Sequence, residues 1–239
     1  YARIDAIEGF AADVSHELKN PLTSLRSAVE TLPRATTDES RMRLLKVIEH
    51  DVRRLDRLIT DISDASRLDA ELVREDAGTV DLRALLTNMI SVLADAHLDH
   101  VTPHLHVDAR PPQGDFTVPG HESRLSQVIS NLVENARSFV DPETGRIDIR
   151  LSARPRWVEI RIEDNGPGIR AENVETIFKR FYTDRPGVDD FGQNSGLGLS
   201  ISRQIVEAHR GTLTAENIVD PNDPDHVRGA RFIVRLPRE

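Results

Sequence analysis

The sequence predicts an α unit followed by an α/β unit: an antiparallel helical hairpin that forms a four-helix bundle on dimerisation, then a two-layer α/β sandwich. Apolar residues recur at alternating steps of three and four through two stretches before residue 70, which is typical of paired helices. Beyond residue 80, short segments of alternating polarity interleave with helix-like ones, as in a mixed sheet with helices on one face. The expected divisions are residues 1–70, a charged linker at 71–79, and residues 80–239.

Composition excludes several classes of function. The 239 residues carry a formal net charge of −9, which argues against a nucleic-acid-binding surface. The absence of cysteine excludes disulfides, thiolate catalysis and cysteine-type zinc sites. No apolar run approaches the roughly 18 residues of a membrane span, and the chain begins within a helix without a methionine. We therefore expect an excised fragment, with any membrane attachment made by segments upstream of it.

The first helix is expected over about Arg3–Leu32. Its apolar seam consists of Ile4, Ile7, Ala11, Val14, Leu18, Pro21, Leu25, Ala28 and Leu32. His16 falls outside this seam, on the solvent side, and Asn20 lies four residues later on the same face. Glu17, beside the histidine, could accept an imidazole N–H and make the other ring nitrogen a better nucleophile. The residues alone leave open that this is an ordinary solvated helix face.

Pro21 follows the histidine by about one helical turn. Inside a helix, proline removes an N–H and its ring clashes with the preceding turn, here with the carbonyl of Glu17, at a cost of about 3 kcal/mol. A kink is therefore expected at this point of the first helix.

A turn at residues 33–38 leads to the second helix, with Thr37 or Asp38 as the N-cap and an end near Leu68. Its expected apolar stripe consists of Leu45, Ile48, Val52, Leu55, Ile59 and Ile62. A two-helix hairpin with one apolar face is too small to stand alone, so a homodimer through residues 1–70 is expected. The alternative is that the hairpin packs on its own C-terminal unit.

The second unit is expected to alternate strands and helices. The expected strands are residues 79–81, 101–107, 116–118, 146–153, 157–164, 211–217 and 229–236. The expected helices are residues 82–96, 122–139, 172–181 and 197–209, with a polar loop at residues 186–195.

Four segments of this unit carry candidate chemistry. Asn131 and Asn135 lie one helical turn apart and could act together on a metal or its phosphates. Residues 164–169, Asp-Asn-Gly-Pro-Gly-Ile, follow a strand, and residues 177–182 place two cations between phenylalanines. A glycine-rich loop at residues 192–200 leads into a helix, which suits phosphate, although it lacks the Gly-Lys-Ser/Thr of a Walker loop. Each segment alone has a plain structural explanation.

Together with the first helix, these segments identify a family. Residues 15–22, Ser-His-Glu-Leu-Lys-Asn-Pro-Leu, resemble the H box of sensor histidine kinases in two-component systems. The four later segments, in this order, resemble the N, G1, F and G2 boxes of their catalytic domain. That domain has the GHKL (Bergerat) fold, shared with Hsp90, gyrase and MutL. The resemblance covers about residues 3–237.

The resemblance implies a role for each matching residue. His16 would be the phospho-acceptor, Glu17 the base that polarises it, and Asn20 the residue that positions water when the kinase acts in reverse. Asp164 would bind the adenine amino group, and Asn135 with Asn131 would hold Mg²⁺ on the phosphates of ATP. The other implied nucleotide-binding residues are Phe139 at the adenine, Arg180 near the terminal phosphate, and Gly166, Gly168, Gly196, Leu197 and Gly198, with residues 186–195 as the lid.

The resemblance also implies the reaction and its partner. The γ-phosphoryl group of ATP would pass to His16 and then to an aspartate of a response regulator receiver domain, with phosphatase activity toward that regulator. The parent would be a bacterial sensor anchored in the inner membrane, with this core in the cytoplasm. Asn131 stands where ATP-hydrolysing relatives carry a glutamate, which favours transfer over hydrolysis.

Ser138 departs from the family pattern, because the N box commonly has lysine there; Arg137 could supply the charge but points about 100° round the helix. Two other functions stay open, a catalytically silent dimerising scaffold and a GHKL protein-serine kinase.

Overall fold

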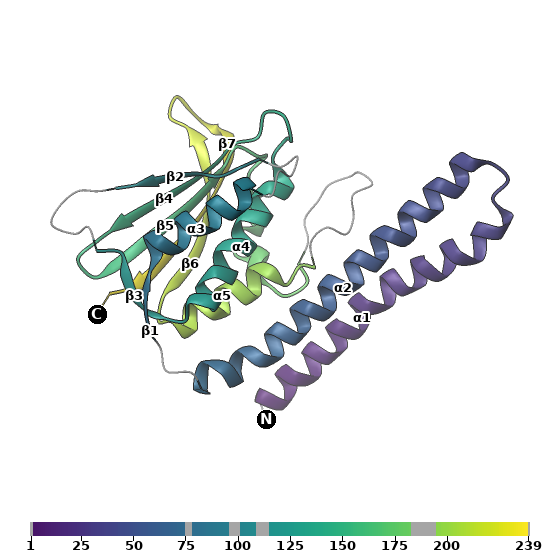
Figure 1. The fold of residues 1–239 in the computed structure, drawn as a ribbon, viewed down its shortest axis with the longest axis horizontal. Coiled ribbons are helices and arrows are strands. Elements are labelled where there is room, and N and C mark those ends of the chain that lie inside the picture. Colours follow the sequence, from purple (N-terminus) through teal and green to yellow (C-terminus); the bar gives the residue numbers. More distant parts are fainter. Residues whose placement is uncertain (1, 75–77, 96–100, 109–114, 183–194, 239) are drawn as a thin grey trace. The chain divides into compact units, whose positions relative to one another are not determined.

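The chain folds into two compact units, one within residues 1–69 and the other within residues 70–182 and 198–239. The structure, a computed structural model, describes residues 2–74, 78–95, 101–108, 115–182 and 195–238. Figure 1 shows a hairpin of two long helices and a sheet covered by helices. None of the described helices is long and apolar enough to cross a membrane.

The hairpin consists of α1 (Ala2–Thr31), a 3₁₀ turn η1 (Leu32–Arg34) and α2 (Asp38–Arg74). Thr37 caps α2, because its Oγ1 accepts the backbone N–H of Ser40 at 3.2 Å. α1 continues through Pro21, and the expected kink stays a prediction. The expected end of the second helix near Leu68 is wrong, since the helix enters the expected linker. Low apolar content does not stop a helix that meets no glycine or proline, and the intervening residues favour helix.

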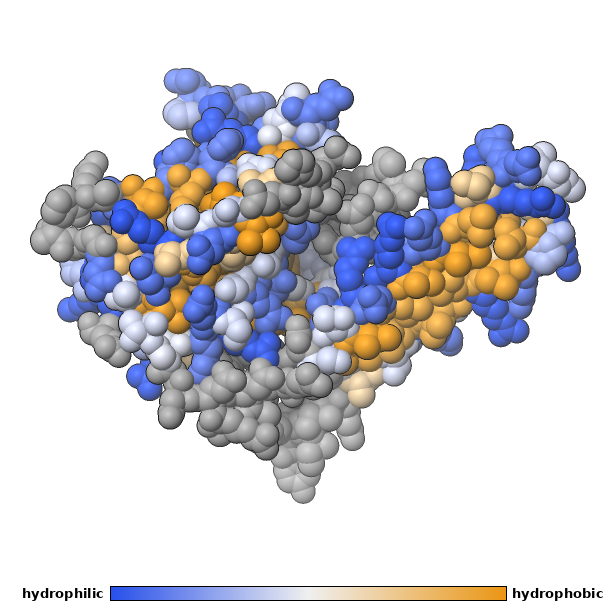
Figure 2. Space-filling view, in the orientation of Figure 1, coloured by the Kyte–Doolittle hydropathy of each residue, from blue (hydrophilic) through white to orange (hydrophobic). Residues whose placement is uncertain are grey.

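The apolar residues expected to form a single stripe on α2 divide between two rows, one buried against α1 and one exposed. On α2, Leu58 is fully buried and Ile48, Leu55 and Ile62 are partly buried. On α1, Pro21 and Ala28 are buried. A second row faces outward and is called here the outer apolar row: Leu22, Val29, Met42, Leu45, Val52 and Ile59, which are 46–57% exposed. Figure 2 shows apolar surface running along the hairpin. One partner helix covers only one of the two rows, so the other is left on the surface.

The second unit is a mixed sheet with helices on one face, as expected. Strands β2 (His104–Val107), β4 (Ile147–Ala153), β5 (Trp157–Asp164), β7 (Asp223–Pro237) and β6 (Thr212–Asp220) form the five-stranded sheet in that order. Only the β2–β4 pair among these neighbours is parallel. β1 (Gly78–Asp81) and β3 (Thr117–Gly120) form a separate antiparallel pair.

Three helices, α3 (Leu82–Asp95), α4 (Glu122–Phe139) and α5 (Gly198–Ala208), cover one face of the sheet (Figure 1). The largest fully buried side chains of the unit are Leu82, Leu86, Leu125, Ile129, Leu132, Ile147, Ile149, Leu151, Ile160 and Ile162. The helix expected over 172–181 is wrong; the structure has two 3₁₀ turns, η2 (Ala171–Asn173) and η3 (Thr176–Phe178).

The opposite face of the sheet is covered by ion pairs. Glu159 on β5 pairs with Arg161 and with Arg235 of β7, each at 2.7 Å. Glu163, four residues further along β5, pairs with Arg231 at 2.6 Å and with Arg150 of β4 at 3.1 Å. These charged residues alternate with buried Ile160 and Ile162, so the strand has one face in the core and one charged face.

A buried histidine joins two of the helices. His209, just after α5, donates from Nδ1 to the carbonyl of Ile205 at 2.7 Å, and its Nε2 accepts the backbone N–H of His121 at 3.1 Å. His121 is the N-cap of α4. Acceptance at Nε2 requires the neutral ring, whereas donation from Nδ1 to Ile205 favours the charged one. Burial lowers the pKa of His209 below its ordinary 6.5 and outweighs the Ile205 bond, with the His121 ring adding to the lowering.

This histidine makes the stability of the α/β unit depend on pH. In the unfolded chain His209 takes up a proton near pH 6.5, whereas in the folded chain it does so only at lower pH. The stability linked to the neutral ring is therefore fully present above pH 6.5 and is lost as the pH falls through the lowered folded pKa. We expect His209→Gln to flatten the dependence of the unfolding midpoint on pH between about 7 and 5. The matched control is exposed His104→Gln, which should keep the wild-type slope; equal slopes in all three proteins would contradict the assignment.

Candidate active site

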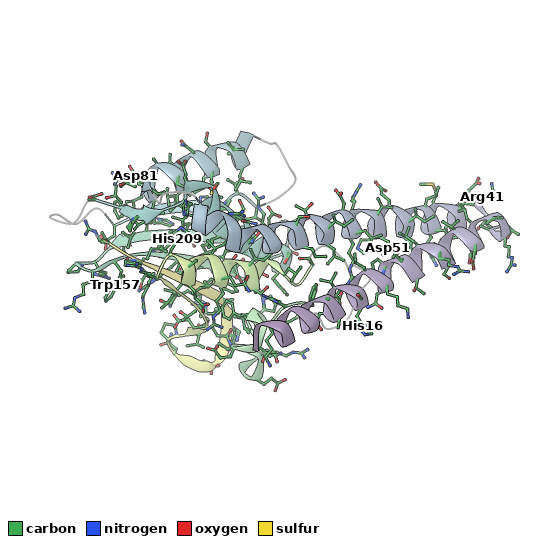
Figure 3. All side chains as sticks on the ribbon, turned by 90° about the horizontal axis from the view of Figure 1, so that it is seen from below. His16, Arg41, Asp51, Asp81, Trp157 and His209 are labelled. Carbon is green, nitrogen blue, oxygen red and sulfur yellow. The ribbon has the colours of Figure 1, made fainter. Side chains whose placement is uncertain are left out.

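His16 lies where the sequence predicts it, on the exposed outer side of α1, away from α2 (Figure 3). Asn20, one turn later, is also exposed. The neighbouring Ser15 bonds back to the carbonyl of Ala11 at 2.7 Å. The imidazole is therefore accessible to a large substrate, which an apolar seam position would not permit.

Glu17 does not accompany His16 on the exposed side. Its side chain is three-quarters buried, and the carboxylate pairs through Oε2 with Nη2 of Arg54 on α2 at 3.1 Å. Among the described residues, the hydrogen bond recorded for the Glu17 side chain is the one to Arg54, not one to His16. The expected Glu17–His16 contact stays a prediction, and Arg54 is a partner that the sequence analysis missed.

Asp164, at the end of β5, lies where the strand meets the glycine-containing turn. Its Oδ1 accepts the backbone N–H groups of Gly166 at 2.9 Å and Ala230 at 3.3 Å. Burial raises the pKa of this carboxyl, against the lowering effect of those two hydrogen bonds. With Oδ1 engaged, Oδ2 is the oxygen that could accept an N–H from a ligand.

The turn after Asp164 needs its glycines. A Cβ on Gly166 would lie 2.9 Å from the carbonyl oxygen of Phe139, and Gly168 has φ +78°. Asn217 of β6 then fixes the turn, because its Oδ1 accepts the N–H of Ile169 at 2.7 Å and its Nδ2 donates to the Ile169 carbonyl at 2.6 Å. Asn217 was not predicted, because nothing in its local sequence marks a contact made 48 residues away.

Gly229 on β7 was also missed as a site residue. It has φ +153°, and a Cβ there would lie 1.8 Å from the backbone oxygen of Asp164. Only glycine lets β7 approach β5 closely enough for the Ala230 N–H to reach the Asp164 carboxylate.

We expect Gly229→Ala to destabilise the α/β unit by about 3 kcal/mol, since the backbone must move to relieve the overlap. Denaturant unfolding followed by far-UV circular dichroism measures the change. Gly78→Ala is the matched control on another strand, because the nearest atom to its added Cβ is 4.0 Å away. Equal unfolding midpoints for the two variants would show that β7 has room for a side chain.

The polar residues of α4 divide into two groups. Asn131 donates from Nδ2 to the Gly198 carbonyl at 3.2 Å and to Ser202 Oγ at 3.3 Å, which ties α4 to the start of α5. Its Oδ1 is the atom that could bind a metal. Arg137 instead donates to the Val101 carbonyl at 3.1 Å and to Glu134 at 3.0 Å. Arg137 is thus engaged elsewhere and does not replace the missing lysine at Ser138, whose hydroxyl bonds the Asn135 carbonyl.

Asn135 and Phe139 lie further along the same helix and are partly buried. Amide oxygens suit Mg²⁺, which takes oxygen ligands and uses few protein groups where phosphates supply the rest. Within the described ranges, the structure contains no group of three or more His, Asp or Glu side chains that could hold a metal. The amide oxygens of Asn131 and Asn135 are the kind of ligand that fits Mg²⁺.

The segment before α5 adopts a glycine turn. Gly196 has φ +73°, and the N–H of Leu197 bonds Ser195 Oγ at 3.1 Å. Gly198 opens the 11-residue α5, whose first backbone N–H groups suit an anion. A Cβ on Gly198 would make only ordinary contacts with Asn131, at 3.6 Å or more, so the fold alone does not require glycine there. Residues 186–194 of the expected lid lie outside the described residues.

The two basic residues of the aromatic segment are exposed, and the aromatic residue before them is structural. Phe178 packs edge-to-face on Phe232 at 6.4 Å, and the Arg203 guanidinium lies 4.7 Å from its ring centroid. Arg180 is exposed two residues later, and its approach to a phosphate stays a prediction.

Comparison with known families agrees with both units. Residues 6–71 match the His Kinase A (phospho-acceptor) domain. Residues 120–239, half of the chain, match the histidine kinase-, DNA gyrase B- and HSP90-like ATPase family. The chain belongs to the two-component sensor histidine kinases. The predicted family and the predicted GHKL fold are confirmed.

Individual histidine kinases resemble the chain over nearly its full length. It is 58% identical over 240 residues to the sensor protein ChvG of Agrobacterium fabrum and 59% identical over 245 residues to the sensor protein ChvG of Rhizobium meliloti. These alignments cover 99% of this chain but 40% and 41% of those proteins. The crystal structure of the histidine kinase ThkA with the response regulator protein TrrA is 25% identical, with a TM-score of 0.72, and the match covers 100% of this chain and 64% of that one.

Proposed function

We propose that the chain is the catalytic core of a sensor kinase that transfers the γ-phosphoryl group of ATP to His16 and then to an aspartate of a response regulator receiver domain. The observation that carries this proposal is the exposed imidazole of His16 on the phospho-acceptor helix of a histidine kinase. The ATPase-family unit, with Asp164 at a strand end and backbone N–H groups at the start of α5, supports ATP as the donor. ThkA, a relative of similar fold, is described in complex with a response regulator.

In the proposed reaction, a neutral ring nitrogen of His16 attacks the γ-phosphorus in line with the departing ADP oxygen, so that a P–N bond forms as the P–O bond breaks. Glu17 accepts the N–H of the other ring nitrogen and stabilises the positive charge that develops. Mg²⁺, when bound, neutralises charge on the phosphates, and Asn135 with Asn131 would hold it.

The remaining residues position the nucleotide. Oδ2 of Asp164 accepts a hydrogen bond from the adenine amino group. Phe139, Gly166 and Gly168 shape the base pocket. Arg180 approaches the terminal phosphate, and residues 196–198 lie under the phosphates. Asn131 cannot act as a general base, so bound ATP is not hydrolysed before His16 is reached. Asn20 positions the water in the proposed phosphatase reaction.

Acid stability of the product tests the reaction class. The purified chain, incubated with γ-labelled ATP and Mg²⁺, should acquire phosphate that acid releases, as phosphohistidine does, and should pass it to a receiver domain. Acid-stable label would indicate a serine kinase instead. No label would indicate a silent scaffold.

We further propose that the active form is a homodimer, because the outer apolar row needs a partner. Two hairpins paired along this row would form a four-helix bundle with the row inside. Burying six large apolar side chains from each chain contributes favourable free energy on the order of 1 kcal/mol or more per side chain.

We expect Val52→Asp, in the middle of the outer apolar row, to convert the dimer into a monomer at micromolar concentration, because a buried carboxylate would be unpaired there. Light scattering coupled to size exclusion measures the molar mass. Lys46→Asp, on an exposed and polar side of the same helix, is the matched control and should remain dimeric. A monomeric wild type would contradict the proposal.

A further inference from the structure

The seam of the hairpin contains charged groups that the proposed reaction does not use. Asp51 on α2 is 6% exposed, the only charged residue buried to this degree in the described part of the hairpin. Its Oδ2 has no hydrogen-bond partner, and its Oδ1 lies 3.7 Å from Nδ1 of His50, too far for a hydrogen bond. A buried carboxylate oxygen without a partner costs free energy, so its presence calls for a physical reason.

Arg54 lies one turn further along the same helix and is also incompletely paired. Its Nη2 bonds Glu17 of α1, while its buried Nε has no partner. Residues three apart on a helix are neighbours on its surface. Arg54 and Asp51 therefore carry complementary, unpartnered atoms within one turn of α2, a spacing at which an arginine and an aspartate side chain can pair.

We propose that Arg54 exchanges between two carboxylates, Glu17 and Asp51, and that this exchange decides whether Glu17 is available to His16. In the observed arrangement the guanidinium holds Glu17 in the seam between the helices. In the alternative arrangement it pairs with Asp51, and Glu17 is released to accept the imidazole N–H. Arg54 and Asp51 are thus positioning residues for phosphorylation, acting through Glu17, and the inference rests on the proposed function.

The arrangement has the features of a two-state element. The side chains of Arg54 and Glu17 are 21% and 25% exposed, and Asp51 is 6% exposed. At this depth a charged hydrogen bond contributes more than on the surface, and an unpaired carboxylate is costly. Each state satisfies one carboxylate at the expense of the other, so neither is overwhelmingly favoured. A change of one charged hydrogen bond then shifts the populations substantially.

Opposite effects of two substitutions test the exchange. Asp51→Asn weakens the alternative pairing, so Glu17 stays with Arg54 and the initial rate of His16 labelling should fall by about threefold to tenfold. Arg54→Met releases Glu17, so the rate should rise by a similar factor, about threefold to tenfold. Affinity for a non-hydrolysable ATP analogue should be unchanged in both. Damage to the hairpin structure alone would lower the rate in both variants.

The double variant Asp51→Asn/Arg54→Met completes the test. Without the Arg54 guanidinium, Asp51 has no group to draw away from Glu17 and should not affect the labelling rate. The double variant should therefore label at the rate of Arg54→Met alone. It also removes the unpaired buried carboxylate, so if Arg54→Met folds poorly the double variant is compared with the wild type instead, and the same raised rate is expected. Arg53→Gln is the matched control, because it removes a guanidinium that pairs with Glu49 on the exposed face, and it should leave the rate unchanged.

Two outcomes would overturn the exchange. Rates that change in the same direction in both single variants would show that the cluster is only structural. An undiminished effect of Asp51→Asn in the Arg54→Met background would show that Asp51 acts independently of Arg54. The proposed function fails separately, if the wild-type chain takes no label or labels at a residue other than His16.

Discussion

Replacing His16 with alanine is expected to reduce ATP-dependent labelling by about 10⁴-fold, to background. Loss of an attacking nucleophile has effects of this order, because the remaining groups only bind and orient the donor. The exposed position of His16 means that the change removes no packing, so α1 and the molar mass should be unaffected. Filter-bound counts after incubation with γ-labelled ATP and Mg²⁺ measure the effect.

Two controls separate loss of the acceptor from loss of the donor site. Affinity for an ATP analogue should be unchanged in His16→Ala, since His16 has no place in the proposed nucleotide site. His104→Ala, at another exposed histidine, should label like the wild type. Retained labelling in His16→Ala would place the phospho-acceptor elsewhere and reject the proposed mechanism.

Asp164→Asn is expected to weaken ATP binding by about two orders of magnitude while leaving the fold intact. The asparagine oxygen can keep the bonds from Gly166 and Ala230, but its NH₂ group would replace Oδ2 and face the adenine amino group, donor against donor. Calorimetry or a fluorescent ATP analogue measures the affinity.

The raised pKa of Asp164 predicts that this loss of binding comes without loss of stability. Burial makes ionisation harder in the folded chain than in the unfolded chain. The stability linked to this group is therefore full below the unfolded pKa and is lost as pH rises through the folded value, so ionised Asp164 costs stability at neutral pH. Asp164→Asn should unfold at the same or a higher temperature than the wild type at pH 7.

Glu163→Gln provides the matched control for this variant. It removes a carboxylate one residue earlier, on the opposite face of β5, where Glu163 pairs with Arg231 and Arg150. ATP affinity should be unchanged. If Glu163→Gln weakens binding as much as Asp164→Asn does, the effect is one of net charge or strand stability, and Asp164 has no special place in the site.

Local sequence was sufficient where a residue's role depends on its neighbours along the chain. The outward position of His16 followed from the helical period, and the boundaries of α4 and β5 followed from theirs. The turn at Gly166 and Gly168 was predicted because backbone conformation at a turn is set by a few adjacent residues. The family followed from the order of five short segments.

Contacts between distant segments were not predictable in this way. Three members of the outer apolar row, Leu45, Val52 and Ile59, were taken as part of one stripe with the buried positions of α2, because a helix with two apolar rows does not indicate which row its partner covers. The end of α2 was misplaced because composition alone does not terminate a helix. Asn217 and Gly229 support the Asp164 turn from strands that follow it by many residues, and their local sequences carry no sign of it.

The sequence by itself determined the class of this protein, the helix that presents His16, and the segments that carry the nucleotide-site residues, because periodicity and turn chemistry act over a few residues. Only the tertiary structure decided that Glu17 faces the seam and pairs with Arg54, that Asp51 is buried beside them, and that Arg137 is committed to Val101 and Glu134. Side-chain partners of this kind depend on how separate helices and strands pack, and a buried charge takes whichever partner that packing brings within reach.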